Sequence, residues 1–199
     1  MSTRCAEALL PGWMRSLRQL LKREPKLSPD RTCELLSGIA AGVESAHKAG
    51  ILHRDLKPEN ILLPESGTGP KVVDFGVAKL STSMAGGGGA TISGAGTIVG
   101  TPAYMAPEQL RGESVDGRAD VFSLGVMTYE MLVGKLPYGS GSFIDIGMKQ
   151  AAGATTVDTG DLPEELASVL RRAIAFERET RPASPTAFAN ELRDTARNR

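Results

Sequence analysis

The spacing of apolar and polar residues predicts helices over most of this chain. Between Ser28 and Gly50, apolar side chains recur every three or four positions, and Pro29 directly after Ser28 is typical of a capped helix start. A shorter helix is predicted from Ser16, which can form a capping box with Gln19. The remaining predicted helices are 121–132, stopped by Gly134, then 143–151, 163–176 and 184–196.

Strands are predicted in one region only. Three short apolar runs, 51–52, 61–63 and 71–73, are separated by turn-forming residues, and they indicate a small β-hairpin that frames a loop. The helix over 121–132 is apolar on nearly all sides, so we expect it to be buried at the centre. The predicted fold class is therefore mainly α within the α+β family, a helical lobe with one small hairpin.

The stretch 81–99 differs from the rest because Gly, Ser, Thr and Ala dominate it. Such residues bury too little apolar surface to offset the entropy lost on ordering the backbone. We expect a long mobile loop there.

Composition narrows the function classes. The chain has 199 residues, of which 41% are hydrophobic, enough for a sizeable core. Its 23 basic and 23 acidic residues balance, so no overall positive field favours a nucleic acid or an anionic membrane. No apolar run is long enough to span a bilayer, and the two cysteines, Cys5 and Cys33, form no disulfide or metal pattern. We expect a cytoplasmic protein with reduced thiols, no nucleic-acid partner and no membrane segment.

One cluster of polar residues points to chemistry. Asp55, Lys57 and Asn60 fall within six residues, and Asp74 follows one hairpin later, which would return its carboxylate to the same loop. Phosphoryl transfer needs oxygen ligands for magnesium and positive charge near the phosphates more than it needs covalent catalysis. The spacing favours a phosphoryl-transfer site.

Several ordered motifs resemble those of the serine/threonine protein kinases, specifically their larger C-terminal lobe. The catalytic loop is matched by HRDLKPEN at 53–60, the magnesium motif by DFG at 74–76, and the end of the activation segment by GTPAYMAPE at 100–108. The resemblance implies a kinase C-lobe over 15–199, with an activation segment over 74–108 and an irregular segment over 1–14.

The resemblance also implies roles for the polar cluster, with ATP and Mg²⁺ as cofactors. Asp55 would accept the proton of the substrate hydroxyl, and Lys57 would neutralise the transferring phosphate. Asn60 and Asp74 would bind magnesium, and Leu62 would lie beneath the adenine. The alternatives are a turn-capping aspartate at 55, a solvated lysine at 57 and an Asx turn at 60.

Other matched residues would support the site. His53 and Phe75 are expected to pack in a hydrophobic spine, and Thr101 to bond near Asp55 and dock the substrate. The expected structural contacts are a buried ion pair between Glu108 and Arg181, and an anchor from Asp120 to the catalytic-loop backbone.

An arginine before the catalytic aspartate suggests control by phosphorylation. In the family, Arg54 would pair with a phosphate added to the activation loop, and Thr91, Ser93 and Thr97 are the available acceptors. The alternative is that these three are ordinary polar residues of a flexible loop.

The sequence lacks matches to the smaller, ATP-clasping N-lobe. No G-x-G-x-x-G occurs, and residues 1–14 contain no lysine. Two hypotheses follow. The chain is the catalytic region of a serine/threonine kinase, impaired when alone, which acts on Ser and Thr of protein substrates; or it is an inactive C-lobe that serves as an interaction module. Either way, an N-lobe or another kinase is an expected partner.

Overall fold

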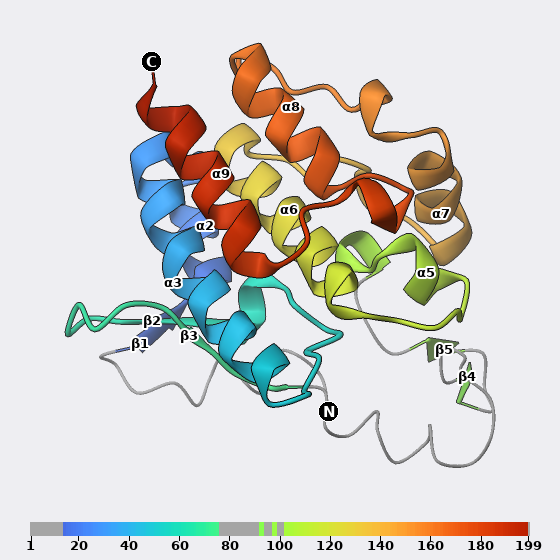
Figure 1. The fold of residues 1–199 in the computed structure, drawn as a ribbon, viewed down its shortest axis with the longest axis horizontal. Helices are drawn as coiled ribbons and strands as arrows, with labels where there is room; N and C mark the ends of the chain where they lie inside the picture. The colour runs from blue at the N-terminus through green and yellow to red at the C-terminus, as the bar shows by residue number, and fades with distance from the viewer. Residues whose placement is uncertain (1–13, 76–91, 94–96, 99–101, 199) are drawn as a thin grey trace.

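The protein is described by a computed structural model, which covers residues 14–75, 92–93, 97–98 and 102–198. Most of this part is helical, with a small sheet at one edge (Figure 1). The α-helices are α2 (Leu17–Arg23), α3 (Pro29–Lys48), α5 (Pro107–Leu110), α6 (Gly117–Val133), α7 (Phe143–Ala151), α8 (Glu164–Ala173) and α9 (Pro185–Arg197). Short 3₁₀ turns are η1 (Pro58–Asn60), η3 (Pro102–Tyr104), η4 (Ala154–Thr156) and η5 (Arg178–Thr180).

Serine side chains start the helices where the sequence predicts. Ser16 and Gln19 form the predicted capping box of α2, and the Ser28 hydroxyl accepts from the Arg31 N–H at the start of α3. These bonds satisfy N–H groups that have no partner within the helix. At the other end of α6, Gly134 adopts φ +80°, a left-handed conformation that glycine reaches without steric cost.

Helix α6 is the centre of the core. Helices α3 and α9 pack beside each other and against α6, and α8 covers α6 from another side (Figure 1). Thirteen residues of α6 are buried, among them Phe122, Leu124 and Met127, which are fully inaccessible to solvent. The prediction of a central buried helix is confirmed, although the helix starts at Gly117 rather than 121. Its first turn escaped the sequence prediction because Arg118 and Asp120 interrupt the apolar pattern.

The predicted hairpin is present between the runs 61–63 and 71–73 and carries an additional strand. The run 51–52, also predicted to frame the 53–60 loop, forms no strand, because the Ile51 N–H donates to the Ala46 carbonyl and closes the C-terminal turn of α3. Strand β2 (Ile61–Pro64) pairs antiparallel with β3 (Lys71–Val72), and its other edge pairs with β1 (Met14–Ser16), opposite in direction. Residue 14 therefore belongs to a strand, which corrects the prediction of an irregular segment through 14. The strand was not predicted because its three residues are too few to show an alternation of apolar and polar side chains.

A second small sheet lies within the stretch expected to be only a loop. Strand β4 (Ile92–Ser93) pairs antiparallel with β5 (Thr97–Ile98), with Ser93 opposite Thr97. Of the predicted loop 81–99, only these four residues are described. In the described part of the chain, no helix combines the length and apolar content that crossing a membrane requires.

Candidate active site

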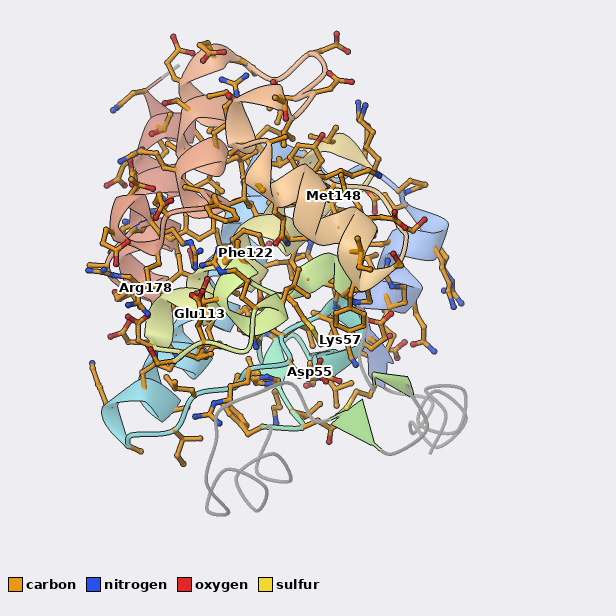
Figure 2. The ribbon with its side chains drawn as sticks, turned by 90° about the vertical axis from the view of Figure 1, so that its right-hand side faces the viewer. Asp55, Lys57, Glu113, Phe122, Met148 and Arg178 are labelled. Atoms are coloured by element: carbon orange, nitrogen blue, oxygen red, sulfur yellow. The ribbon has the colours of Figure 1, made fainter. Side chains whose placement is uncertain are left out.

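Within the 53–60 loop, Asp55 contacts both Lys57 and Asn60. Lys57 Nζ lies 3.1 Å from Asp55 Oδ2, and Asn60 Nδ2 donates to the Asp55 carbonyl oxygen at 2.9 Å. Figure 2 shows Asp55 and Lys57 side by side at the edge of the helical body. Lys57 and Asn60 are buried, whereas the Asp55 side chain is 26% exposed. The Asp55 carboxylate, with the Lys57 cation beside it, is therefore partly exposed, while the two side chains that contact Asp55 are buried.

The backbone before Asp55 is strained and held by side chains from other helices. Arg54 adopts φ +64°, a conformation that costs a non-glycine residue about 1–3 kcal/mol. Asp120, in the first turn of α6, accepts from the N–H groups of His53 and Arg54, each at 2.8 Å. His47 Nε2 lies 2.7 Å from the same carboxylate. Asp120 therefore makes the expected contact with the loop backbone.

His53 and Phe75 pack as expected. The fully buried His53 ring accepts the Asp55 N–H on Nδ1 at 3.3 Å, so its Nε2–H donates to the Val73 carbonyl at 2.9 Å. The ring centroids of His53 and Phe75 are 4.8 Å apart. With both nitrogens engaged, His53 serves packing and orientation.

The hairpin brings Asp74 to the same site. The Val73 N–H donates to the Asn60 carbonyl at 3.0 Å, so Asp74 follows directly after a residue bonded to Asn60. Asp74 is exposed and adopts φ +58°; it and Arg54 are the two non-glycine residues with positive φ among those described.

The donor set at this place fits magnesium. Because Asn60 uses its amide nitrogen to bond Asp55, its Oδ1 remains as an oxygen ligand, and Asp74 contributes an exposed carboxylate. Mg²⁺ prefers such oxygen ligands. Asn60 and Asp74 would therefore hold the ion.

The other predicted site residues are placed less completely. Leu62 is half-buried in β2. Ser93 and Thr97 are described only as members of β4 and β5. Thr91 and Thr101 lie outside the described residues, so their predicted roles stay predictions.

The expected ion pair between Glu108 and Arg181 is present and enclosed. The Arg181 guanidinium donates to both carboxylate oxygens, at 2.8 and 2.9 Å, and the two side chains are 0% and 2% exposed. It also lies 5.0 Å from the centroid of the Phe122 ring. The Arg181 guanidinium also donates hydrogen bonds to the carbonyl oxygens of Ala175, Phe176 and Arg118.

Sequence reasoning missed a second charged cluster beside the loop. Arg18 of α2 donates to Glu59 at 2.8 Å and to Glu130 of α6 at 2.7 Å, and it also bonds the hydroxyl of Tyr104, which donates to Glu130 at 2.5 Å. Burial raises the pKa of Tyr104, and Glu130 raises it further, so the hydroxyl keeps its proton. Glu59 immediately precedes Asn60, so this cluster holds the 53–60 loop against α2 and α6. The four residues are too far apart in sequence for any motif to reveal them.

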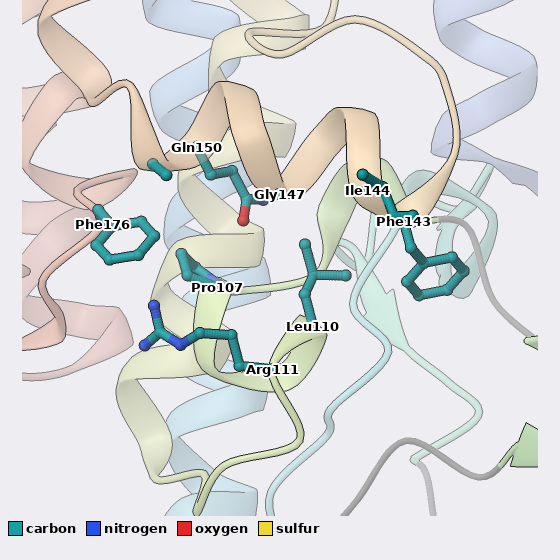
Figure 3. Close-up of a pocket in the computed structure, with 9 residues that line it drawn as sticks. Pro107, Leu110, Arg111, Phe143, Ile144, Gly147, Gln150 and Phe176 are labelled. Atoms are coloured by element: carbon teal, nitrogen blue, oxygen red, sulfur yellow. The ribbon is translucent and has the colours of Figure 1, made fainter.

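An apolar groove lies between α5 and α7, and none of the residues that line it belongs to the 53–60 loop (Figure 3). Its volume is about 290 Å³. Arg111 stacks over the Phe176 ring, 4.6 Å from its centroid, at one end, and Phe143 lies at the other. On the same helix α7, Ile144 and Met148 are 74% and 70% exposed.

Comparisons with known proteins show the family of the chain. The family model described as protein kinase domain matches residues 9–192. The chain is 36% identical over 191 residues to serine/threonine-protein kinase pkn3 of Myxococcus xanthus, covering 92% of this chain and 35% of that protein. It is 40% identical over 177 residues to Pkn1 of the same organism, covering 83% and 24%. The chain thus spans about a quarter to a third of the length of these bacterial relatives.

A solved structure supports the fold. The kinase domain of PknI of Mycobacterium tuberculosis superimposes with a TM-score of 0.63 at 23% identity, covering 92% of this chain and 62% of that one. At this identity the likeness concerns the fold alone. The family model begins at residue 9, and residues 1–13 lie outside those described, so the expected absence of an N-lobe stays a prediction.

Proposed function

Because the chain belongs to the protein kinase domain family, we propose that it carries the catalytic region of a serine/threonine protein kinase. The reaction is transfer of the γ-phosphate of ATP to Ser and Thr hydroxyls of protein substrates, with Mg²⁺ as cofactor. Bound magnesium would neutralise charge on the phosphates.

The chain's own residues then divide the work. Asp55 orients the substrate hydroxyl and accepts its proton, since its carboxylate is 26% exposed, whereas the other carboxylate of the loop, Glu59, is paired with Arg18. Lys57, held 3.1 Å from it, places a positive charge where the transferring phosphate would lie. Asn60 and Asp74 hold the magnesium ion, and Leu62 supports the adenine.

The observation that carries this proposal is the network around Asp55, which bonds both Lys57 and Asn60, with the residue before Asp74 bonded to the Asn60 backbone. These bonds support a preorganised arrangement of Asp55, Lys57 and Asn60, with Asp74 next to it in the chain. Preorganised charges of this kind supply most of the rate in phosphoryl transfer. The strain at Arg54 and Asp74 has a reason if the loop is built for catalysis.

The test is the Asp55→Asn variant, which is nearly isosteric but cannot accept the proton. In the presence of an added kinase N-lobe, Mg²⁺ and ATP, we expect phosphate transfer to a library of Ser and Thr peptides to fall about 100-fold or more. The circular dichroism spectrum and thermal midpoint should stay those of the wild type. The control is Asp161→Asn, at an exposed position away from the loop, which should transfer at the wild-type rate. Wild-type transfer by Asp55→Asn refutes the assignment.

We further propose that this region alone is a poor catalyst. These 199 residues contain no G-x-G-x-x-G to cover the phosphates. Full activity would then require a phosphate clamp supplied by other residues. Adding a kinase N-lobe to the assay should raise the transfer rate and lower the KM for ATP, whereas a wild-type chain with full activity alone would contradict this view.

The groove and the exposed Ile144 and Met148 favour a second candidate, an interaction module without catalysis. The two candidates separate with one double variant. The interaction module is supported if the wild type transfers no phosphate and the variant that combines Asp55→Asn with Asp74→Asn still captures the partner.

A further inference from the structure

The side-chain amide of Gln109 connects α5 to the loop before Asp55. Its Nε2 donates to the Arg54 carbonyl at 2.8 Å, and its Oε1 accepts from the Ala106 N–H at 3.0 Å. A carboxamide has one donating and one accepting end, and here a carbonyl faces one end and an N–H the other. The two partners therefore fix the orientation of the amide.

The bond acts on the strained part of the loop. The Arg54 carbonyl and the Asp55 N–H belong to one peptide group, and Gln109 holds its oxygen while His53 Nδ1 accepts its N–H. Asp120 accepts from the N–H of Arg54 itself. The left-handed conformation of Arg54 is thus stabilised by side chains on both sides.

The orientation of this peptide decides where the Asp55 side chain points. Without a donor on its oxygen, the peptide could rotate and let Arg54 relax toward an unstrained conformation, which would turn the following residue. We propose that Gln109 is a positioning residue, which holds the peptide between Arg54 and Asp55 so that the Asp55 carboxylate faces the site. This inference rests on the proposed role of Asp55.

The same amide also couples the acid to the segment that precedes α5. Its other partner, Ala106, is the N-cap of α5, and the 3₁₀ turn η3 lies just before it. A displacement of this segment would therefore withdraw the donor from Arg54. An apolar side chain at 109 could not make this link, and a glutamate would lose the donor while keeping the acceptor.

Gln19 provides a matched control. It occupies the corresponding third position of α2, and its Oε1 accepts from the Ser16 N–H at 2.9 Å, the same capping bond that Gln109 makes. In the part of the chain that the structure describes, it makes no hydrogen bond to the 53–60 loop. Replacing Gln19 therefore tests the loss of an amide at a capped helix start, without the bond to Arg54.

The first experiment compares isotope-labelled wild type, Gln109→Glu and Gln19→Glu by nuclear magnetic resonance. At neutral pH we expect the Arg54 carbonyl carbon and the Asp55 amide signals to shift in Gln109→Glu and to stay unchanged in Gln19→Glu. As the pH falls toward about 4.3, the protonated carboxyl of the introduced glutamate can donate again, so the signals should move back toward their wild-type positions. Unchanged Arg54 and Asp55 signals in Gln109→Glu overturn the inference.

If Gln109→Glu does not fold, the bond between Gln109 and Arg54 is tested in the wild type instead. A nuclear Overhauser effect between the Gln109 side-chain amide protons and the Arg54 Hα supports the bond, and its absence in an otherwise assigned spectrum refutes it.

The second experiment measures phosphate transfer by the same proteins. We expect kcat to fall about tenfold in Gln109→Glu, with the KM for ATP unchanged, and to stay at the wild-type value in Gln19→Glu. Equal losses in both variants would refute a positioning role. If the Arg54 and Asp55 signals shift in Gln109→Glu but the wild type transfers no phosphate, the role of Gln109 in fixing this peptide is supported and the proposed function is rejected.

Discussion

At the scale of single residues, the enclosed pair of Glu108 and Arg181 illustrates how a buried charge depends on its partner. Arg181 is inaccessible to solvent, and its guanidinium has no water to replace a lost carboxylate. The bond geometry is bidentate, which favours arginine over lysine at this position.

We predict that Glu108→Gln lowers the free energy of unfolding by about 3–5 kcal/mol, because it leaves Arg181 buried without its countercharge. Chemical denaturation followed by circular dichroism measures this. The control is Glu113→Gln, which removes the exposed pair with Arg111 and should leave the denaturation midpoint unchanged. Equal effects of the two changes would mean that burial of the pair is irrelevant.

The sequence predicted the residues that stand in short motifs and missed those whose importance depends on distance in space. Asp55, Lys57, Asn60 and Asp74 belong to such motifs, so their proximity could be predicted from the loop and the hairpin. Arg18 offers no such signal, because its partners lie in distant parts of the chain. The assigned chemical roles remain proposals, whereas the contacts between Glu108 and Arg181 and between Asp120 and the loop are present.

At the scale of helices, close contact between α6 and α8 depends on one missing side chain. A Cβ built on Gly125 would lie 2.9 Å from Ala173 Cβ and 2.9 Å from Ile174 Cγ2. These atoms belong to α8 and its C-terminal end, which cannot yield without separating the two helices.

We predict that Gly125→Ala destabilises the protein, although alanine favours a helix by about 1 kcal/mol over glycine. Forcing a methyl group into a packed core costs about 1–3 kcal/mol, which outweighs the gain. Gly147→Ala in α7 is the control, because its new Cβ would meet only Leu110 Cδ1, at 4.0 Å, and it should raise stability. Thermal unfolding of both variants measures the contrast, and a stabilised Gly125→Ala would contradict the described packing.

The sequence predicted helix starts that depend on a local cap, but it did not predict the short elements. Ser16 and Ser28 start α2 and α3 as predicted, since a cap needs only neighbouring residues. Helix α8 ends at Ala173, before the predicted limit of 176. The four-residue helix α5 and the strand β1 are too short to show a period, and tertiary contacts decide them.

At the scale of the whole molecule, the three tyrosines of the chain, Tyr104, Tyr129 and Tyr138, are all buried. Burial raises the pKa of Tyr129 to about 12, with a further contribution from Asp158, and it raises the pKa of Tyr104 and Tyr138 as well. The folded state therefore favours the protonated form of each. The corresponding stability is complete below the unfolded pKa of about 10 and is lost as the pH rises through the folded values.

We predict that the protein unfolds under alkaline conditions as its tyrosines ionise together. Absorbance at 295 nm should report tyrosinate formation above about pH 10, coincident with loss of helical circular dichroism. Tyrosines that ionise near their ordinary pKa in a chain that keeps its helices would show that these hydroxyls are accessible. Sodium chloride at the same ionic strength near neutral pH is the control, and it should leave the helices intact.

The burial of α6 on all sides has a consequence during synthesis. Residues 117–133 leave the ribosome before α8 and α9, which cover them in the folded protein. At roughly 5–20 residues per second, this apolar segment stays exposed for about 3 to 12 s before Leu192 also leaves the ribosome. A chaperone that binds extended apolar segments would find α6 during this interval, and a chain broken off before α9 would keep the segment exposed to aggregation and proteolysis.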